Sequence, residues 1–155
     1  DKFKDMIKMH LPYPYYKTLY NFNNIKTFTI FRNPIDRILS AISHDVFINK
    51  TNIELIKKDI VTYIEKQRNN YSYHNNFFTP QINYLDMNTK IWKFENGFNE
   101  DFCKWIKNNF EFKIKPITQK KDLVLDGYNK IKLSNNIIDI IKNMYKLDFK
   151  IWKEI

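Results

Sequence analysis

Apolar side chains follow two different spacings along the chain, and these spacings predict its elements. Residues 27–31 form a short apolar run of the kind found in a buried β-strand. Residues 90–95 alternate between polar and apolar side chains and predict a second strand, and residues 5–10 predict a short edge strand. Over 34–47 and 52–68 the apolar side chains recur every three or four residues, which indicates amphipathic helices.

Signals for helix starts accompany this pattern. Pro34 has the fixed φ and the missing N–H that suit a first helical turn. Asn52, Asn99 and Ser134 are residue types that cap helix N-termini, and the last two precede further apolar stripes, so two more helices are expected. Strands that alternate with helices predict the α/β class, with a small, mostly parallel sheet flanked by helices. No repeat or linker divides the chain, so residues 1–155 are expected to form a single domain.

Composition narrows the possible functions. With 155 residues, 43% of them hydrophobic, the chain is long and apolar enough for a proper core. Only two glycines are present, which excludes the usual Gly-rich phosphate loop. A single cysteine excludes an internal disulfide framework, and the scattered histidines show no metal-ligand spacing, so no metal is expected. No transmembrane run or signal peptide is visible, which favours a cytoplasmic location.

The chain has a formal net charge of +9. Such a charge suits an anionic partner, which could be a nucleotide, a sulfated glycan, a nucleic acid or a membrane surface. The plain alternative is a solvated surface made basic by a general excess of lysine. Only three of the 26 basic residues are arginines, namely Arg32, Arg37 and Arg68. In a chain so rich in lysine, an arginine points to a need for the planar guanidinium fork.

The most informative segment joins the first strand to the first helix. Arg32 follows the strand directly, at the edge where open α/β sheets bind ligands. Ser40 lies about two turns into the helix that follows, near the same edge. An arginine and a hydroxyl beside a helix N-terminus make a suitable clamp for a phosphate group. The plain alternative is an ordinary strand–helix corner with a solvated arginine.

The pattern Arg32-x-Pro34-x-x-Arg37-x-x-Ser40 after an apolar strand resembles the 3′-phosphate-binding segment of the sulfotransferase family. The likeness is closest to the branch that sulfates carbohydrates. The resemblance implies a P-loop sulfotransferase-like fold and a sulfuryl donor, 3′-phosphoadenosine 5′-phosphosulfate. It also implies that Arg32 and Ser40 hold the 3′-phosphate of this nucleotide, with a carbohydrate hydroxyl as the expected acceptor.

Three further segments resemble the same family in the same order. Residues 73–81, YHNNFFTPQ, resemble the loop before the family's next strand, in which a Pro-Gln pair commonly follows an aromatic residue. Residues 91–95, IWKFE, resemble that strand, which often ends in Glu. Residues 145–149, YKLDF, resemble the closing helix, where a Tyr-x-x-Asp-Phe pattern recurs. With the first segment, these matches cover most of residues 8–152.

The resemblance also implies catalytic roles. His10 lies where glycan sulfotransferases carry a histidine that acts as general base, and a neutral imidazole can take the proton of a sugar hydroxyl near pH 7. Glu95, at the end of the second strand, is a candidate for a second base or for orienting a ligand. The plain alternatives are a turn histidine and a capping or surface carboxylate.

Further candidates lie in the connecting segments. Lys120 and Lys121 fall in a segment that folds over the donor nucleotide in many sulfotransferases, so they could meet a phosphate as point charges. His74 and Gln81 could line the cleft for the acceptor. A solvated charge run is the plain alternative for the lysines.

One part of the family pattern is missing. The loop that holds the 5′-phosphosulfate, with Lys, Gly and Ser or Thr at a strand-to-helix turn, normally precedes the region of His10, and no stretch before His10 supplies it. The chain is therefore expected to be the C-terminal part of a longer enzyme or a reduced, inactive relative. Two alternative functions stay open. One is a non-catalytic domain that binds nucleotides or polyanions. The other is a basic nucleic-acid-binding protein whose aromatic residues 71, 73, 77 and 78 stack on bases, although no basic stripe interleaves with them.

Overall fold

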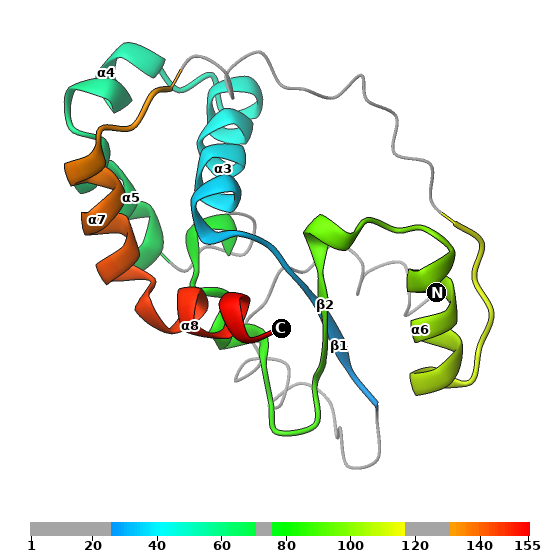
Figure 1. Cartoon of the computed structure of the whole chain (residues 1–155). Coiled ribbons are helices and arrows are strands. Elements are labelled where there is room, and N and C mark those ends of the chain that lie inside the picture. Colours follow the sequence, from blue (N-terminus) through cyan, green and yellow to red (C-terminus); the bar gives the residue numbers. More distant parts are fainter. Residues whose placement is uncertain (1–25, 71–75, 117–130) are drawn as a thin grey trace.

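A computed structural model describes residues 26–70, 76–116 and 131–155 of the chain, and these residues are mostly helical (Figure 1). His10, His74, Lys120 and Lys121 lie outside the described residues, as does the strand expected over 5–10. The described part holds a two-stranded parallel sheet flanked by helices. The flanked parallel sheet agrees with the sequence prediction, but helices make up more of the structure than the α/β class led us to expect.

The sheet consists of β1 (Phe28–Phe31) and β2 (Lys90–Lys93). The strands pair in register from Phe28 opposite Lys90 to Phe31 opposite Lys93. The second strand is shorter than predicted, because residues 94–96 turn into the short 3₁₀ helix η3 (Phe94–Asn96). Since the strands are parallel, their carboxyl ends meet at one edge, and Arg32 and Glu95 follow at this edge.

Helix α3 (Pro34–Ile48) begins three residues after β1 and confirms the first predicted helix. Asn33 caps it, because its side-chain oxygen accepts hydrogen bonds from the main-chain N–H groups of Ile35 and Asp36. Pro34 occupies the first helical position, where its missing N–H costs no hydrogen bond. The corner between strand and helix therefore follows from local signals alone.

Two helices that the apolar pattern predicted as continuous are each broken in the structure. The first becomes α4 (Ile53–Lys58) and α5 (Ile60–Asn69), separated by Asp59. The Asp59 side chain accepts from the N–H of Thr62 and so caps the second piece. The apolar stripe continues across this break, which is why periodicity did not reveal it.

The last predicted helix is divided in the same way, into α7 (Asn135–Met144) and α8 (Lys146–Glu154). Tyr145 separates them with φ −114° and ψ 31°, outside the helical region. Ser134 caps α7 as predicted, since its hydroxyl accepts from the N–H of Ile137. The change of direction brings α8 close to the ends of the strands (Figure 1).

One hydrophobic core lies among α3, α5 and α7, together with the short 3₁₀ helix η1 (Asn76–Phe78). Its buried members are largely the isoleucines that the apolar stripes predicted: Ile38, Ile42, Ile56, Ile60, Ile64 and Ile141. Burial of each such side chain contributes about 1.5–3 kcal/mol. The core thus fixes the helices on one side of the sheet.

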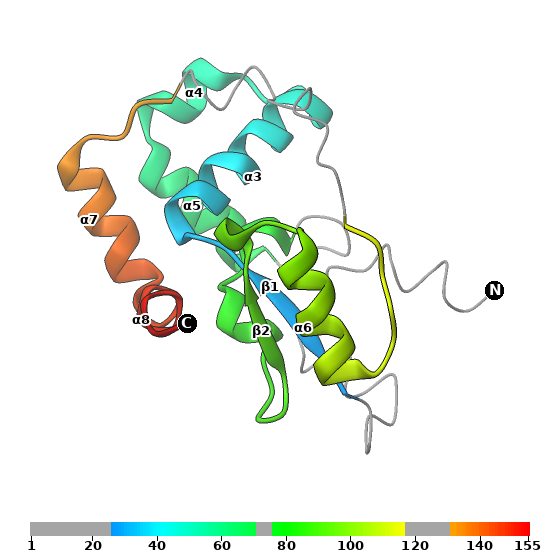
Figure 2. The same cartoon turned by 45° about the vertical axis from the view of Figure 1, so that its right-hand side comes forward.

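Helix α6 (Glu100–Phe110) covers the other side of the sheet and lies in front of β1 in Figure 2. An aromatic cluster joins it to the strands. The Phe28 ring meets Trp105 edge-on at 5.8 Å between centroids, and Trp92 lies 5.3 Å from Phe102. Asn99 caps α6 as predicted. None of the helices in the described ranges is long and apolar enough to cross a membrane.

Candidate functional site

Arg32 is placed at the carboxyl edge of the sheet, one residue past β1 and two residues before α3. Its guanidinium carbon lies 4.8 Å from the centroid of the Phe94 ring, which follows β2. This cation–π contact holds the side chain across the ends of both strands. No ion pair within the described ranges includes Arg32, so its guanidinium hydrogens are not committed to a carboxylate there.

The main chain of Arg32 is held by a side chain that is far away in the sequence. The Gln81 side-chain oxygen accepts from the N–H of Arg32 at 2.9 Å, and the Gln81 side-chain nitrogen donates to the carbonyl of Arg32 at 2.8 Å. Gln81 is only 5% exposed. Its amide was predicted to contact an acceptor, but in the structure both of its polar atoms support the strand end. Its observed role is therefore to position Arg32.

Gln81 is itself fixed by a buried carboxylate on α8. The two oxygens of Asp148 accept from the N–H groups of Gln81, at 2.6 Å, and Ile82, at 2.9 Å. These N–H groups begin the 3₁₀ helix η2 (Gln81–Tyr84). Asp148 is 1% exposed, and its burial raises the pKa of its carboxyl against the opposing effects of these hydrogen bonds and of Arg37 and Arg68.

Arg37 belongs to the same motif as Arg32 but has a different role. Its guanidinium donates to the carbonyl of Thr79 at 2.7 Å and, at 3.5 Å, to that of Asn76. The Tyr145 hydroxyl donates to the carbonyl of Phe78 at 2.6 Å. Burial lowers the pKa of Arg37 and raises that of Tyr145. Arg37 is thus a structural group that ties α3 to the loop before Pro80, and it is less available to a ligand than Arg32.

Glu95 lies at the strand ends, as predicted, but its carboxylate has two partners. One oxygen accepts from the N–H of Asn33 at 2.7 Å, and the other accepts from the indole N–H of Trp152 at 3.2 Å. Lys93 completes this contact, because its ammonium donates to the Trp152 carbonyl at 3.0 Å and lies 4.5 Å from the Trp152 ring. The contacts of Trp152 therefore hold the end of α8 against the carboxyl edge of the sheet.

Ser40 is partly buried on α3, seven residues after the capping Asn33. Seven residues are about two helical turns, so Ser40 lies on the same side of the helix as Asn33, about 10 Å further along the axis. No hydrogen bond between described residues uses the Ser40 hydroxyl. Ser40 thus faces the side of α3 on which Asn33 lies, near the middle of the helix, and no contact joins it to Arg32 in the described ranges; that both meet one phosphate group stays a prediction.

The sequence analysis missed the partners of Arg32. Phe94 stands in the 91–95 segment, but nothing in that segment showed its contact with Arg32, which is tertiary. Trp152, which binds Glu95 and not Arg32, lies outside the segments that carry the resemblance. A signal for Gln81 did exist, since Gln81 and Asp148 stand in two of the segments that carry the family resemblance. In the part of the chain that the structure describes, no three His, Cys, Asp or Glu side chains lie together in a way that could hold a metal ion.

Comparison of the chain with protein-family models, with curated proteins and with solved structures found no match in any of the three. The geometry of the strand ends therefore carries the functional argument.

Proposed function

We propose that this chain is a sulfotransferase-like domain whose strand ends bind the 3′-phosphate of 3′-phosphoadenosine 5′-phosphosulfate. The donor's sulfuryl group would pass to a hydroxyl, in the first instance one on a carbohydrate. Arg32 would bind the phosphate with its guanidinium fork, and Ser40 would add a hydroxyl donor. The N-terminus of the 15-residue helix α3 begins two residues after Arg32 and favours negative charge.

One observation carries the proposal: segments that resemble the family are bound to one another around Arg32. Gln81, from the Pro-Gln segment, holds the Arg32 main chain, and Asp148, from the closing helix, holds Gln81. Tyr145, from the same closing segment, binds the carbonyl of Phe78. The segments are 49 to 67 residues apart, so these contacts do not follow from sequence proximity.

The catalytic part of the proposal rests on the resemblance. His10 would take the proton from the acceptor hydroxyl as the new S–O bond forms, while the S–O bond to the 5′-phosphate breaks. Lys120, Lys121 and His74 would face the donor or the acceptor. Because residues 1–9 do not supply the loop that binds the 5′-phosphate, a segment other than these residues would have to provide it.

Titration calorimetry tests the nucleotide site. Adenosine 3′,5′-bisphosphate should bind more tightly than adenosine 5′-monophosphate, because only the former offers a 3′-phosphate to Arg32. Arg32→Gln should cost roughly 1.5–3 kcal/mol of bisphosphate binding and leave the monophosphate nearly unaffected. Equal affinities for the two nucleotides would reject the phosphate site.

A second candidate is a non-catalytic domain that binds nucleotides or polyanions. The observation in its favour is that each Glu95 oxygen already accepts a hydrogen bond, one of them from the main chain, so this carboxylate has a structural role that needs no catalysis. Salt dependence separates the two kinds of binding. Binding by scattered lysines should fall steeply with salt and ignore Ser40→Ala, whereas a specific phosphate site should respond to Ser40→Ala.

The nucleic-acid alternative gains no support from the aromatic residues suggested for base stacking. Phe78 is 1% exposed and belongs to the core. Phe77 packs against His44, with ring centroids 4.7 Å apart. Tyr71 and Tyr73 lie outside the described residues.

A further inference from the structure

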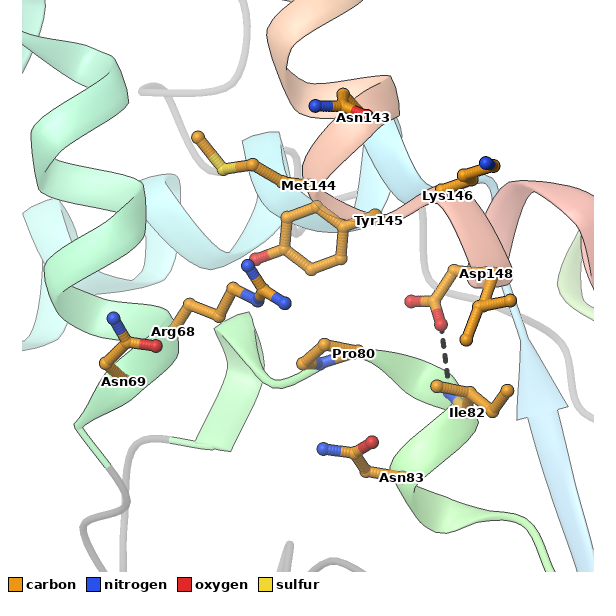
Figure 3. A pocket seen from close by; sticks show the side chains of 11 residues that line it. Arg68, Asn69, Pro80, Ile82, Asn83, Asn143, Met144, Tyr145, Lys146 and Asp148 are labelled. Carbon is orange, nitrogen blue, oxygen red and sulfur yellow. Dashed lines mark hydrogen bonds between the residues drawn. The ribbon is translucent and has the colours of Figure 1, made fainter.

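A pocket of about 360 Å³ opens between the end of α5, the turn at Pro80 and the junction of α7 with α8 (Figure 3). This volume lies near the lower end of the range for small-molecule sites, roughly 300–1,000 Å³. Arg32 and Ser40 are not among the residues that line it. The pocket is therefore separate from the strand-end site and needs an explanation of its own.

The charge in this pocket comes chiefly from Arg68, the third arginine of a lysine-rich chain. Its guanidinium carbon lies 5.5 Å from the centroid of the Tyr145 ring, and in Figure 3 it points into the pocket. No ion pair among residues 26–70, 76–116 and 131–155 uses Arg68. The contact with the ring orients the fork and leaves its N–H groups for a ligand.

Among the described residues that line the pocket, one carboxylate, that of Asp148, feels the charge of Arg68 but forms no ion pair with it. Its two oxygens already accept main-chain N–H groups, and the side chain is 1% exposed. Lys146 also lines the pocket and adds a second positive charge at its edge (Figure 3). The balance in the pocket is therefore positive, and the strongest complement is an oxyanion held by the arginine fork.

Among the described residues, the remaining polar lining consists of three asparagines, Asn69, Asn83 and Asn143. Each carboxamide offers two donors and one acceptor, which suits hydroxyl groups that both donate and accept. A nucleobase fits less well, because Tyr145, the one aromatic side chain that the described part of the chain adds to the lining, is 2% exposed and Arg68 lies over its ring. The described lining therefore offers amide groups that suit hydroxyls beside a positive charge that suits one negative group.

We propose that this pocket binds an acidic sugar unit, with Arg68 on its carboxylate and the asparagine amides on its hydroxyls. A sulfate or phosphate ester on a sugar would offer a similar oxyanion, so the test has to separate these sources. The proposal goes beyond the nucleotide site and does not require it.

The test follows amide NMR signals of the chain during titration with D-glucuronate, D-glucose and D-glucose 6-phosphate. Glucuronate should shift the signals of Arg68, Asn83 and Asn143, whereas neutral glucose should not. Arg68→Gln should weaken glucuronate binding about tenfold or more, and Arg68→Lys should weaken it less. An equal response to glucose, an unchanged affinity in Arg68→Gln, or a response to glucose 6-phosphate alone would overturn the proposal.

Because Arg68 packs on a core tyrosine, a variant that preserves this contact is also required. Asn83→Asp keeps the shape of the side chain and adds a negative charge to the pocket, so it should weaken glucuronate binding several-fold at an unchanged melting temperature. If this folded variant binds glucuronate with unaltered affinity, glucuronate does not bind in the pocket.

Arg32→Gln is the matched control, since it removes an arginine from the other site. It should leave the glucuronate affinity unchanged, just as Arg68→Gln should leave bisphosphate binding unchanged. Loss of glucuronate binding in Arg32→Gln would place the sugar at the strand ends and overturn the assignment. Bisphosphate binding without glucuronate binding would reject the pocket and leave the proposed function standing.

Discussion

The side-chain amide of Gln81 binds both main-chain polar groups of Arg32, accepting from the N–H at 2.9 Å and donating to the carbonyl at 2.8 Å. It thereby continues the hydrogen-bonding pattern of the sheet by one residue beyond β1. Asp148 holds Gln81 from the other side through the Gln81 N–H. The orientation of Arg32 at the strand end thus depends on a buried carboxylate on the last helix.

Gln81→Glu tests the support that the Gln81 amide gives to the Arg32 main chain, with the smallest change of side-chain shape. One carboxylate oxygen can still accept from Arg32, but the other now faces the Arg32 carbonyl, and a buried charge is added. We expect a loss of about 1–3 kcal/mol of folding free energy. Bisphosphate binding should weaken too, because the Arg32 main chain loses its fixed position. Urea denaturation and calorimetry measure the two effects.

Asn136→Asp makes a matched amide-to-carboxylate change at an exposed position of α7. It should change the folding free energy by less than about 0.5 kcal/mol. Similar losses in both variants would mean that the Gln81 amide contributes no specific support.

Asp148→Asn removes one of two acceptors and places an NH₂ group against a buried main-chain N–H. Since an unsatisfied buried donor costs about 1–3 kcal/mol, we expect a loss of that size in urea denaturation. Asp139→Asn is the control, because Asp139 forms an exposed ion pair with Lys142 on α7. Such pairs contribute little, so this variant should remain close to the natural chain. Equal stabilities for the two variants would contradict the role given to Asp148.

Alkaline titration reports on two tyrosines. Burial raises the pKa of both Tyr63 and Tyr145 above the usual value of about 10, and the neighbouring Asp45 adds to the shift at Tyr63. The unfolded chain therefore releases these protons first. The stability that they contribute is fully present below about pH 10 and is lost as the pH rises through the native values.

Absorbance of ionised phenols should accordingly show at least the two late-titrating groups of the described residues, Tyr63 and Tyr145, in the folded chain, and Tyr145→Phe should remove one late-titrating group. In denaturant, these late-titrating tyrosines should ionise in the same pH range as the other tyrosines. Ionisation of all ten tyrosines together near pH 10 in a chain that is still folded by circular dichroism would contradict this.

The features that the sequence predicted well are those with local causes. The predicted caps Asn52, Asn99 and Ser134 bind N–H groups two or three residues away, so their signal is complete within one turn. The core stripe was equally predictable, because burial follows the helical period. The break at Tyr145 was not, since the tertiary hydrogen bond from its hydroxyl to Phe78 is invisible in the local pattern.

The candidate site was predictable only in part, for the same reason. The position of Arg32 follows from a strand that ends before a proline-started helix. The sequence could not show that Gln81 turns toward Arg32, or that Arg37 turns away from the strand end to bind Thr79. These contacts join residues 42 and 49 positions apart, and only the packing of α3 against η1 and α8 brings them together.

The two arginines of one motif should therefore respond differently to replacement by lysine. Arg37→Lys loses the fork that reaches two carbonyls, so it should destabilise the fold by about 1–3 kcal/mol. Arg32→Lys should leave stability within about 0.5 kcal/mol and weaken bisphosphate binding instead. Thermal denaturation and calorimetry on both variants separate stability from binding. A stability loss in Arg32→Lys as large as that in Arg37→Lys would mean that both arginines are structural.

Glu95→Gln tests whether the carboxylate at the strand ends opposes an anion. The side-chain oxygen of the glutamine can still accept from Asn33, while the negative charge near Arg32 is removed. If a phosphate binds at Arg32, bisphosphate affinity should rise a few-fold, and the gain should shrink at high salt.

Glu100→Gln removes an equal charge from the exposed start of α6 and should change the affinity little. In a longer chain that carries the upstream loop, tighter binding together with lower turnover would assign Glu95 to the chemical step. If Glu95→Gln leaves the bisphosphate affinity unchanged at low salt, the phosphate does not bind at the carboxyl edge of the sheet.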